Sequence, residues 1–94
     1  MDLLFLGKPL GENHPTTAIS LNNLASLYNS QERYSEAIPL LERWKDIQRE
    51  RQETQNKSYA DRIRTIGRLY EKCQQFPQAV AAYEETLFLF NHLL

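Results

Sequence analysis

Apolar residues recur along this chain at steps of three and four residues, in four separate stretches. This spacing places them on one face of an α-helix. The pattern predicts a first helix that follows Pro15 and ends near 30, a second from about 34 to about 53, a third that begins between 56 and 58, and a fourth from 76 toward the chain end. Thr16 or Thr17 is placed to cap the first helix. Short connections make consecutive helices antiparallel.

The second half of the chain repeats the first with a period of 42 residues. Leu24, Ala25 and Tyr28 return as Ile66, Gly67 and Tyr70, and Ala37 returns as Ala79. A fixed period with retained apolar positions is typical of proteins whose units stack on their neighbours. We therefore predict an all-α fold of two tandem antiparallel helix hairpins with four main helices. Residues 1–14 would be the remnant of a preceding unit, 15–54 the first repeat, and 55–94 a divergent second repeat.

Side-chain size and polarity predict how the hairpins close. Small residues should let paired helices approach, Ala25 against Ala37 and Gly67 against Ala79. Glu42 and its counterpart Glu84 are expected to be outward polar positions. In the fourth helix, the residues expected to form the apolar face are Ala79, Val80, Tyr83, Leu87, Phe88 and Phe90.

These positions resemble the tetratricopeptide repeat (TPR), whose pattern is W-x2-L-G-x2-Y followed by A-x3-F. The matching residues are Leu21, Leu24, Ala25, Tyr28, Ala37 and Leu41 in the first unit, and Ile63, Ile66, Gly67, Tyr70, Ala79 and Tyr83 in the second. The 42-residue period and the segments 10–15 and 20–25 look like the kinesin-light-chain type, so the fold would be a fragment of a TPR-like α-solenoid. Glu32 and Gln74 stand where the family usually has a turn glycine. Trp44 and Thr86 stand where it usually has an alanine that faces the next unit's first helix.

The resemblance implies a protein-binding module that holds a peptide or partner protein on its concave face. By register, that face is lined by Ile19 and Asp61 and by the predicted partner-binding residues, which are Asn22, Asn23, Ser26, Asn29, Arg64, Thr65 and Arg68. Asparagine amides both donate and accept, which suits a peptide backbone. Arg64 and Arg68, one turn apart, suit a carboxylate. Lysine is absent from these positions, so the family's full carboxylate-clamp set is not matched. Alternatively, these are ordinary polar surface residues, with the arginines paired to Asp61 and Glu71.

The fourth helix ends in an apolar run. Repeat arrays generally need about three units and a polar terminal cap for stability and solubility. We therefore expect either a piece of a longer array or self-association, as a symmetric homodimer or an exchanged hairpin. The residues predicted for self-association are Leu87, Phe88, Phe90, Leu93 and Leu94.

Composition changes this interpretation little. With 41% hydrophobic and 24% charged residues and a net charge of -1, the chain has no general attraction for nucleic acid or an anionic membrane. Basic residues prevail from 43 to 72, but acidic ones are interleaved, so a solvated face is favoured and nucleic-acid binding is a remote alternative. The single cysteine, Cys73, fits a reducing compartment, and a cytoplasmic location is expected. His14 and His92 lack a matched ligand set, so we expect no metal, no cofactor and no enzyme activity.

Overall fold

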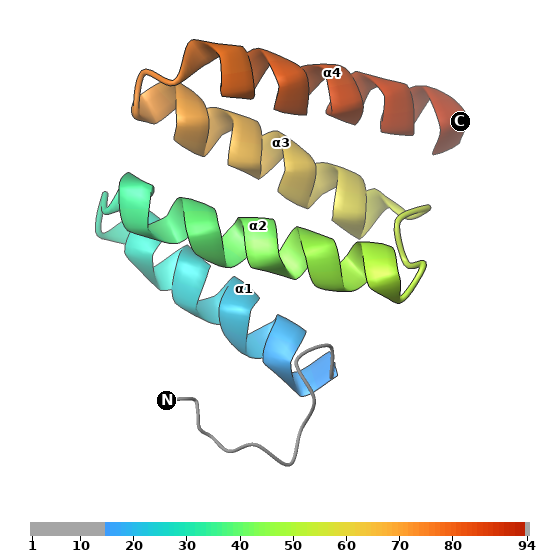
Figure 1. Cartoon of the computed structure of the whole chain (residues 1–94), viewed down its shortest axis with the longest axis horizontal. Helices are drawn as coiled ribbons and strands as arrows, with labels where there is room; N and C mark the ends of the chain where they lie inside the picture. The colour runs from blue at the N-terminus through green and yellow to red at the C-terminus, as the bar shows by residue number, and fades with distance from the viewer. Residues whose placement is uncertain (1–14, 94) are drawn as a thin grey trace.

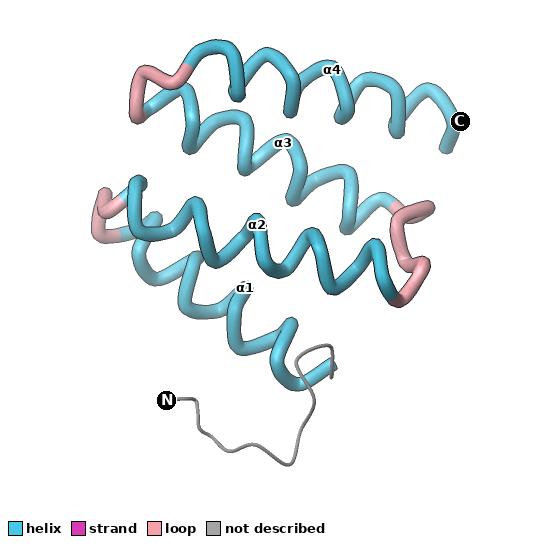
Figure 2. Tube along the Cα trace, in the orientation of Figure 1, coloured by secondary structure: helices cyan, strands magenta, loops and turns pink. Residues whose placement is uncertain are grey.

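The computed structural model describes residues 15–93 as four helices stacked side by side (Figures 1 and 2). They are α1 (Pro15–Ser30), α2 (Tyr34–Glu50), α3 (Lys57–Lys72) and α4 (Phe76–Leu93). Each helix runs antiparallel to its predecessor and packs on it, in a body of 37 × 29 × 19 Å. The predicted all-α fold with two tandem helix hairpins is confirmed. Within the described residues, no helix is both long and apolar enough to cross a membrane.

The helix boundaries carry the 42-residue period of the sequence. The first helices of the two hairpins begin 42 residues apart, and so do the second helices. Asn56 caps α3, because its side chain accepts a hydrogen bond of 2.8 Å from the backbone N–H of Tyr59. Thr16 and Thr17 lie inside the first turn of α1 and not before it, so their predicted capping position is wrong. The second helix ends at Glu50, earlier than predicted.

The C-terminal ends of α1, α2 and α3 close with the same backbone motif. Glu32, Gln52 and Gln74 have φ values of 61°, 59° and 62°, in the left-handed region. After α1, the N–H of Glu32 donates to the carbonyl of Asn29 and that of Arg33 to Tyr28. The same pair of bonds recurs after α2 and α3, which is the Schellman motif. The motif favours glycine, which explains why the resembled family has glycine where this chain has Glu32 and Gln74.

The core runs through both hairpins. Trp44 is buried and stacks on Tyr59, with ring centroids 5.7 Å apart. This confirms that Trp44 packs against the first helix of the second hairpin. Other buried side chains of the core are Ala18, Ala25, Ala37, Ile38, Leu41, Ile47, Ala60, Ile63, Ile66 and Leu69.

The apolar face of α4 differs from the prediction. Its buried residues are Ala79, Ala82, Thr86 and Leu89, whereas three residues expected on the apolar face are exposed: Val80, Leu87 and Phe88. The nearest side chains to Gly67 across the hairpin are Tyr83 and Ala82, with Tyr83 replacing the expected Ala79 as the closest neighbour. A Cβ on Gly67 would lie 2.8 Å from Cε1 of Tyr83. The glycine therefore makes room for an aromatic ring.

Hydrogen bonds between side chains tie the two hairpins together. The hydroxyl of Tyr70 on α3 donates to Glu42 on α2 at 2.7 Å, and Lys45 lies 2.9 Å from the same carboxylate. Glu42 is therefore a contact between hairpins and not the outward polar residue that was expected. Burial opposes ionisation of Glu42, but these hydrogen bonds outweigh it and lower its pKa. Burial and the bond to Glu42 raise the pKa of Tyr70 to about 12.

Candidate functional site

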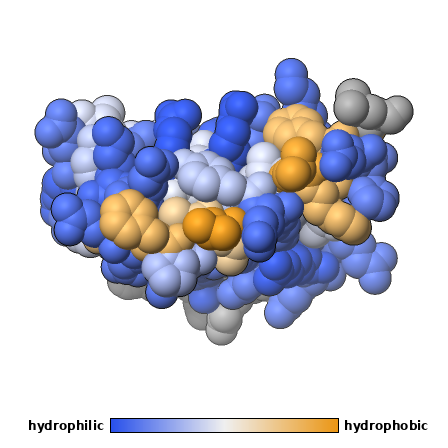
Figure 3. Space-filling view, turned by 90° about the horizontal axis from the view of Figure 1, so that it is seen from above, coloured by the Kyte–Doolittle hydropathy of each residue, from blue (hydrophilic) through white to orange (hydrophobic). Residues whose placement is uncertain are grey.

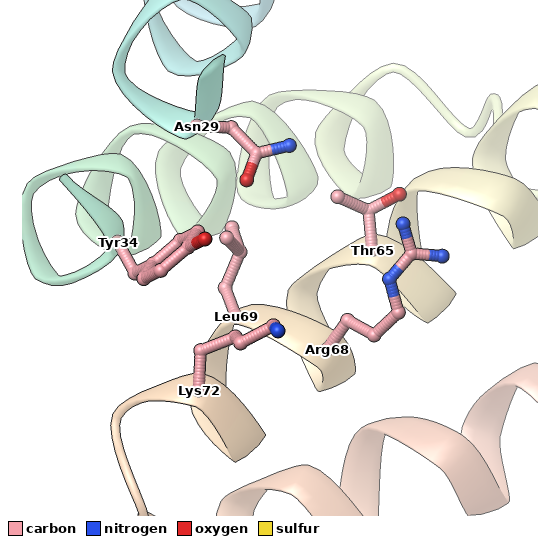
Figure 4. Close-up of a pocket in the computed structure, with 6 residues that line it drawn as sticks. All are labelled: Asn29, Tyr34, Thr65, Arg68, Leu69 and Lys72. Carbon is pink, nitrogen blue, oxygen red and sulfur yellow. The ribbon is translucent and has the colours of Figure 1, made fainter. Parts of the chain in front are cut away.

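A small pocket lies where the two hairpins meet. It has a volume of about 170 Å³ and draws on three helices: the last turn of α1, the first of α2, and the second half of α3. Figure 4 shows the six lining side chains converging from these helices. They are Asn29, Tyr34, Thr65, Arg68, Leu69 and Lys72. The pocket therefore depends on how the hairpins are stacked, since neither hairpin supplies all of its wall.

Two cations line this pocket, Arg68 and Lys72, one helical turn apart on α3. Neither makes an ion pair with a carboxylate within residues 15–93. Lys72 lies over the ring of Tyr34, with its Nζ 5.9 Å from the ring centroid. Glu71, which was expected to pair with the arginines, instead accepts a 2.8 Å hydrogen bond from the hydroxyl of Tyr83. Both cations are thus available to an anion.

Arg68 also has a minor effect on Tyr83 of α4. Burial raises the pKa of Tyr83, and the hydrogen bond to Glu71 raises it further, whereas the guanidinium of Arg68 opposes the rise. Arg68 is exposed, and its side chain also lines the pocket. The remaining walls supply an amide from Asn29, a hydroxyl from Thr65 and apolar contact from Leu69. A carboxylate with a short apolar stem would match this set of groups.

Three of the seven predicted partner-binding residues line the pocket: Asn29, Thr65 and Arg68. Asn23 and Ser26 are exposed on α1, outside it. Arg64 pairs with Asp61 across 3.4 Å, which is the alternative that the sequence left open for it. The Oδ1 atom of Asn22 is buried and accepts no hydrogen bond from the described part of the chain. In this conformation that oxygen is not accessible to a bound peptide.

Sequence reasoning missed Tyr34 and Lys72. Lys72 follows Arg68 by four residues, so extending the same helical stripe by one turn would have placed a lysine on this face. Lys72 is not one of the positions that the register assigned to the concave face, yet it lines the pocket from the end of α3. No sequence signal indicates that the ring of Tyr34 forms a pocket wall.

Basic side chains elsewhere in the stretch 43–72 are largely paired with acidic ones. Lys45 pairs with Glu42, and Arg51 lies 3.1 Å from Glu53. Arg49 of α2 reaches Glu85 of α4 at 3.4 Å. These pairs match the solvated-face interpretation of the basic stretch. No group of three or more His, Cys, Asp and Glu side chains within residues 15–93 could hold a metal ion.

A sequence model of the tetratricopeptide repeat matches residues 8–50, which include both helices of the first hairpin. The search of curated proteins finds no match. Together with the two stacked hairpins, the match supports a TPR-like repeat protein. Proteins of this family generally mediate protein–protein interactions.

Proposed function

We propose that the chain binds an extended peptide of a partner protein, and that a carboxylate of this peptide enters the pocket between the hairpins. The observation that carries the proposal is the pair of cations, Arg68 and Lys72, which line a concave site without a carboxylate partner among residues 15–93. We assign the 42-residue period to repeats of the kinesin-light-chain type, whose concave face would be lined by the first helix of each repeat.

The groups around the two cations favour a peptide over a free small anion. Asn29 offers an amide that both donates and accepts, and its side chain makes no hydrogen bond within the described residues. Asn23 and Ser26 continue a polar stripe along α1 away from the pocket. An extended backbone could follow this stripe, while Leu69 and Tyr34 contact the stem of the acidic side chain.

The test is a binding screen with synthetic seven-residue peptides, each prepared as the free acid and as the carboxyl-terminal amide. Fluorescence anisotropy of labelled peptides reports the affinity. We expect the binders to carry Asp, Glu or a free terminal carboxylate. Arg68→Gln and Lys72→Gln should each weaken binding about tenfold, because each removes a charge-assisted hydrogen bond worth roughly 1.5 kcal/mol.

The matched control is Lys57→Gln, which removes the same charge from the opposite end of α3. Lys57 is exposed and lies outside the pocket, so its variant should bind as the unmodified chain does. Equal losses in all three variants would indicate attraction by net charge alone. A screen without binders, or binders that ignore Arg68 and Lys72, would refute the proposal.

A second candidate function is self-association, and the exposed apolar residues of α4 favour it. Leu87 and Phe88 are both more than half exposed on the last helix, and Phe76 and Val80 extend the exposed apolar surface along its first turns. Figure 3 looks down on the side of the molecule where α4 lies and shows hydrophobic patches there among hydrophilic side chains. Monomeric proteins rarely leave such patches without a partner.

A further inference from the structure

The contact between α2 and α3, here called the junction, is built from positions that have counterparts at both ends of the molecule. A shift of 42 residues maps α2 onto α4 and α3 onto α1. The outer face of α4 therefore corresponds to the side of the junction that α2 supplies. The outer face of α1 corresponds to the side that α3 supplies. The exposure of equivalent residues tests whether these end faces lack a cover.

On α4, residues that correspond to junction residues are uncovered. Ile38 of α2 is only 7% exposed, whereas its counterpart Val80 is 53% exposed. Tyr34, which packs beside the pocket, corresponds to the exposed Phe76. Leu87 corresponds to Lys45, whose side chain is largely covered.

On α1, too, residues that correspond to buried junction residues are exposed. Ile66 and Leu69 belong to α3, which packs on α2, and are 1% and 2% exposed. Their counterparts on α1, Leu24 and Leu27, are 40% and 51% exposed. Within residues 15–93, the two outer helices α1 and α4 thus expose counterparts of the two sides of the junction.

The two residues of the polar contact at the junction also have counterparts, one on α1 and one on α4. Within the chain, the hydroxyl of Tyr70 donates to Glu42. The counterpart of Tyr70 is Tyr28 on α1, and the counterpart of Glu42 is Glu84 on α4. Neither the Tyr28 hydroxyl nor the Glu84 carboxylate bonds to another side chain within residues 15–93. A donor is therefore left at one end and its acceptor at the other.

From these correspondences we infer that copies of this chain stack head to tail, with α1 of one copy seated on α4 of the next. Leu24 and Leu27 would cover Val80 and Leu87, as Ile66 and Leu69 meet α2 inside the chain, and Tyr28 would donate to the neighbour's Glu84. This contact is heterologous, so it can add copies without closing. The inference rests on self-association, the second proposed function, and is independent of the peptide pocket.

The 42-residue shift also distinguishes between the residues that the sequence predicts for self-association. Phe88 corresponds to Asp46 of α2 and Leu93 to Arg51, which directly follows α2, and both counterparts are exposed. Among the four described residues of that set, Leu87 has a counterpart, Lys45, whose largely covered side chain pairs with Glu42, the residue that accepts from Tyr70. Phe88 instead contacts His92, with ring centroids 4.0 Å apart. Leu94 lies outside the described residues.

Sedimentation measurements on two blocked variants test the stacking. The first variant carries Val80→Glu and Leu87→Glu and blocks α4; the second carries Leu24→Glu and Leu27→Glu and blocks α1. All four residues are exposed, so both variants should keep the helical circular dichroism of the unmodified chain. We expect the unmodified chain to grow from 11.1 kDa beyond a dimer as its concentration rises from micromolar to millimolar. Each variant alone should stay monomeric, and their mixture should form a heterodimer, because one free α1 face meets one free α4 face.

Other outcomes would overturn the inference in distinguishable ways. If the variant blocked on α1 still forms homodimers, the chain self-associates through α4 alone and the head-to-tail arrangement is wrong. An unmodified chain that stays at 11.1 kDa at all concentrations would remove self-association as well. Phe88→Glu is the matched control, since it adds the same charge to α4 away from the stacking face. Loss of assembly in this control would also overturn the proposed contact.

Discussion

The turn between α3 and α4 allows a stabilising substitution to be predicted from backbone geometry. Gln74 has a φ of 62°, and its side chain makes no hydrogen bond within residues 15–93. An L-residue in the left-handed region costs about 1–2 kcal/mol. Glycine avoids this cost but loses about 0.5–1 kcal/mol more backbone entropy on folding. Gln74→Gly should therefore raise the free energy of unfolding by about 0.5–1 kcal/mol.

Thermal unfolding followed by far-ultraviolet circular dichroism measures this gain. For a domain of this size, it corresponds to a rise in Tm of about 2–8 °C. Gln52→Gly should give a similar rise, and the two gains should add, because these turns lie at opposite ends of α3. Figure 2 shows the corresponding loops on opposite sides of the molecule.

Two controls separate backbone strain from loss of the side chain. Gln74→Ala keeps a Cβ in the left-handed region, so its stability should stay near that of the unmodified chain. Gln75→Gly places glycine at the next residue, whose φ is not positive, and should lower the Tm. If Gln74→Gly lowers the Tm, or if Gln74→Ala raises it equally, the reasoning from φ is refuted.

Three further substitutions test the packing between helices. Tyr70→Phe removes the hydrogen bond to Glu42 and should lower the free energy of unfolding by about 1–2 kcal/mol in urea titrations. Because the folded state raises the pKa of Tyr70 to about 12 from an unfolded value of 10.0, stability should fall between these pH values, and less so in Tyr70→Phe. Gly67→Ala should destabilise the unmodified chain by about 1–3 kcal/mol, because its Cβ meets the ring of Tyr83. Made in a chain that already carries Tyr83→Ala, the same change should instead stabilise, as thermal unfolding can show. Trp44→Ala should cost about 3–5 kcal/mol and unfold much of the population, as circular dichroism would detect.

Much of the fold could be predicted from the sequence because helix packing repeats locally. The spacing of apolar residues identified four helices, and the 42-residue offset identified which helices are equivalent. Exposure could not be predicted in the same way. Ile38 and Val80 are equivalent in sequence, yet within residues 15–93 Ile38 is covered where the second hairpin packs on α2, whereas Val80 is exposed. Whether an apolar position is buried thus depends on its neighbour in the stack, which periodicity does not report.

The candidate site was predicted only in part for a related reason. Register placed Asn29 and Arg68 on one face, but it carries no information about which arginine pairs within its own helix. Arg64 turned toward Asp61, whereas Arg68 lines the pocket. Tyr34 reaches the pocket from the start of another helix, so its position depends on the stacking of hairpins and not on the pattern within one helix.

Because the pocket takes its wall from both hairpins, peptide binding and folding should be coupled. Asn29 and Tyr34 belong to the first hairpin, and Arg68 and Lys72 to the second, so a bound carboxylate peptide would hold the hairpins in their stacked arrangement. A ligand that binds only the folded state at about 100 times its Kd adds roughly 2.7 kcal/mol of stability. We expect a peptide from the screen to raise the Tm accordingly, and to raise it much less in Arg68→Gln. A peptide that binds with full affinity yet leaves the Tm unchanged would contact a surface that persists after the hairpins separate, and the pocket would not be its site.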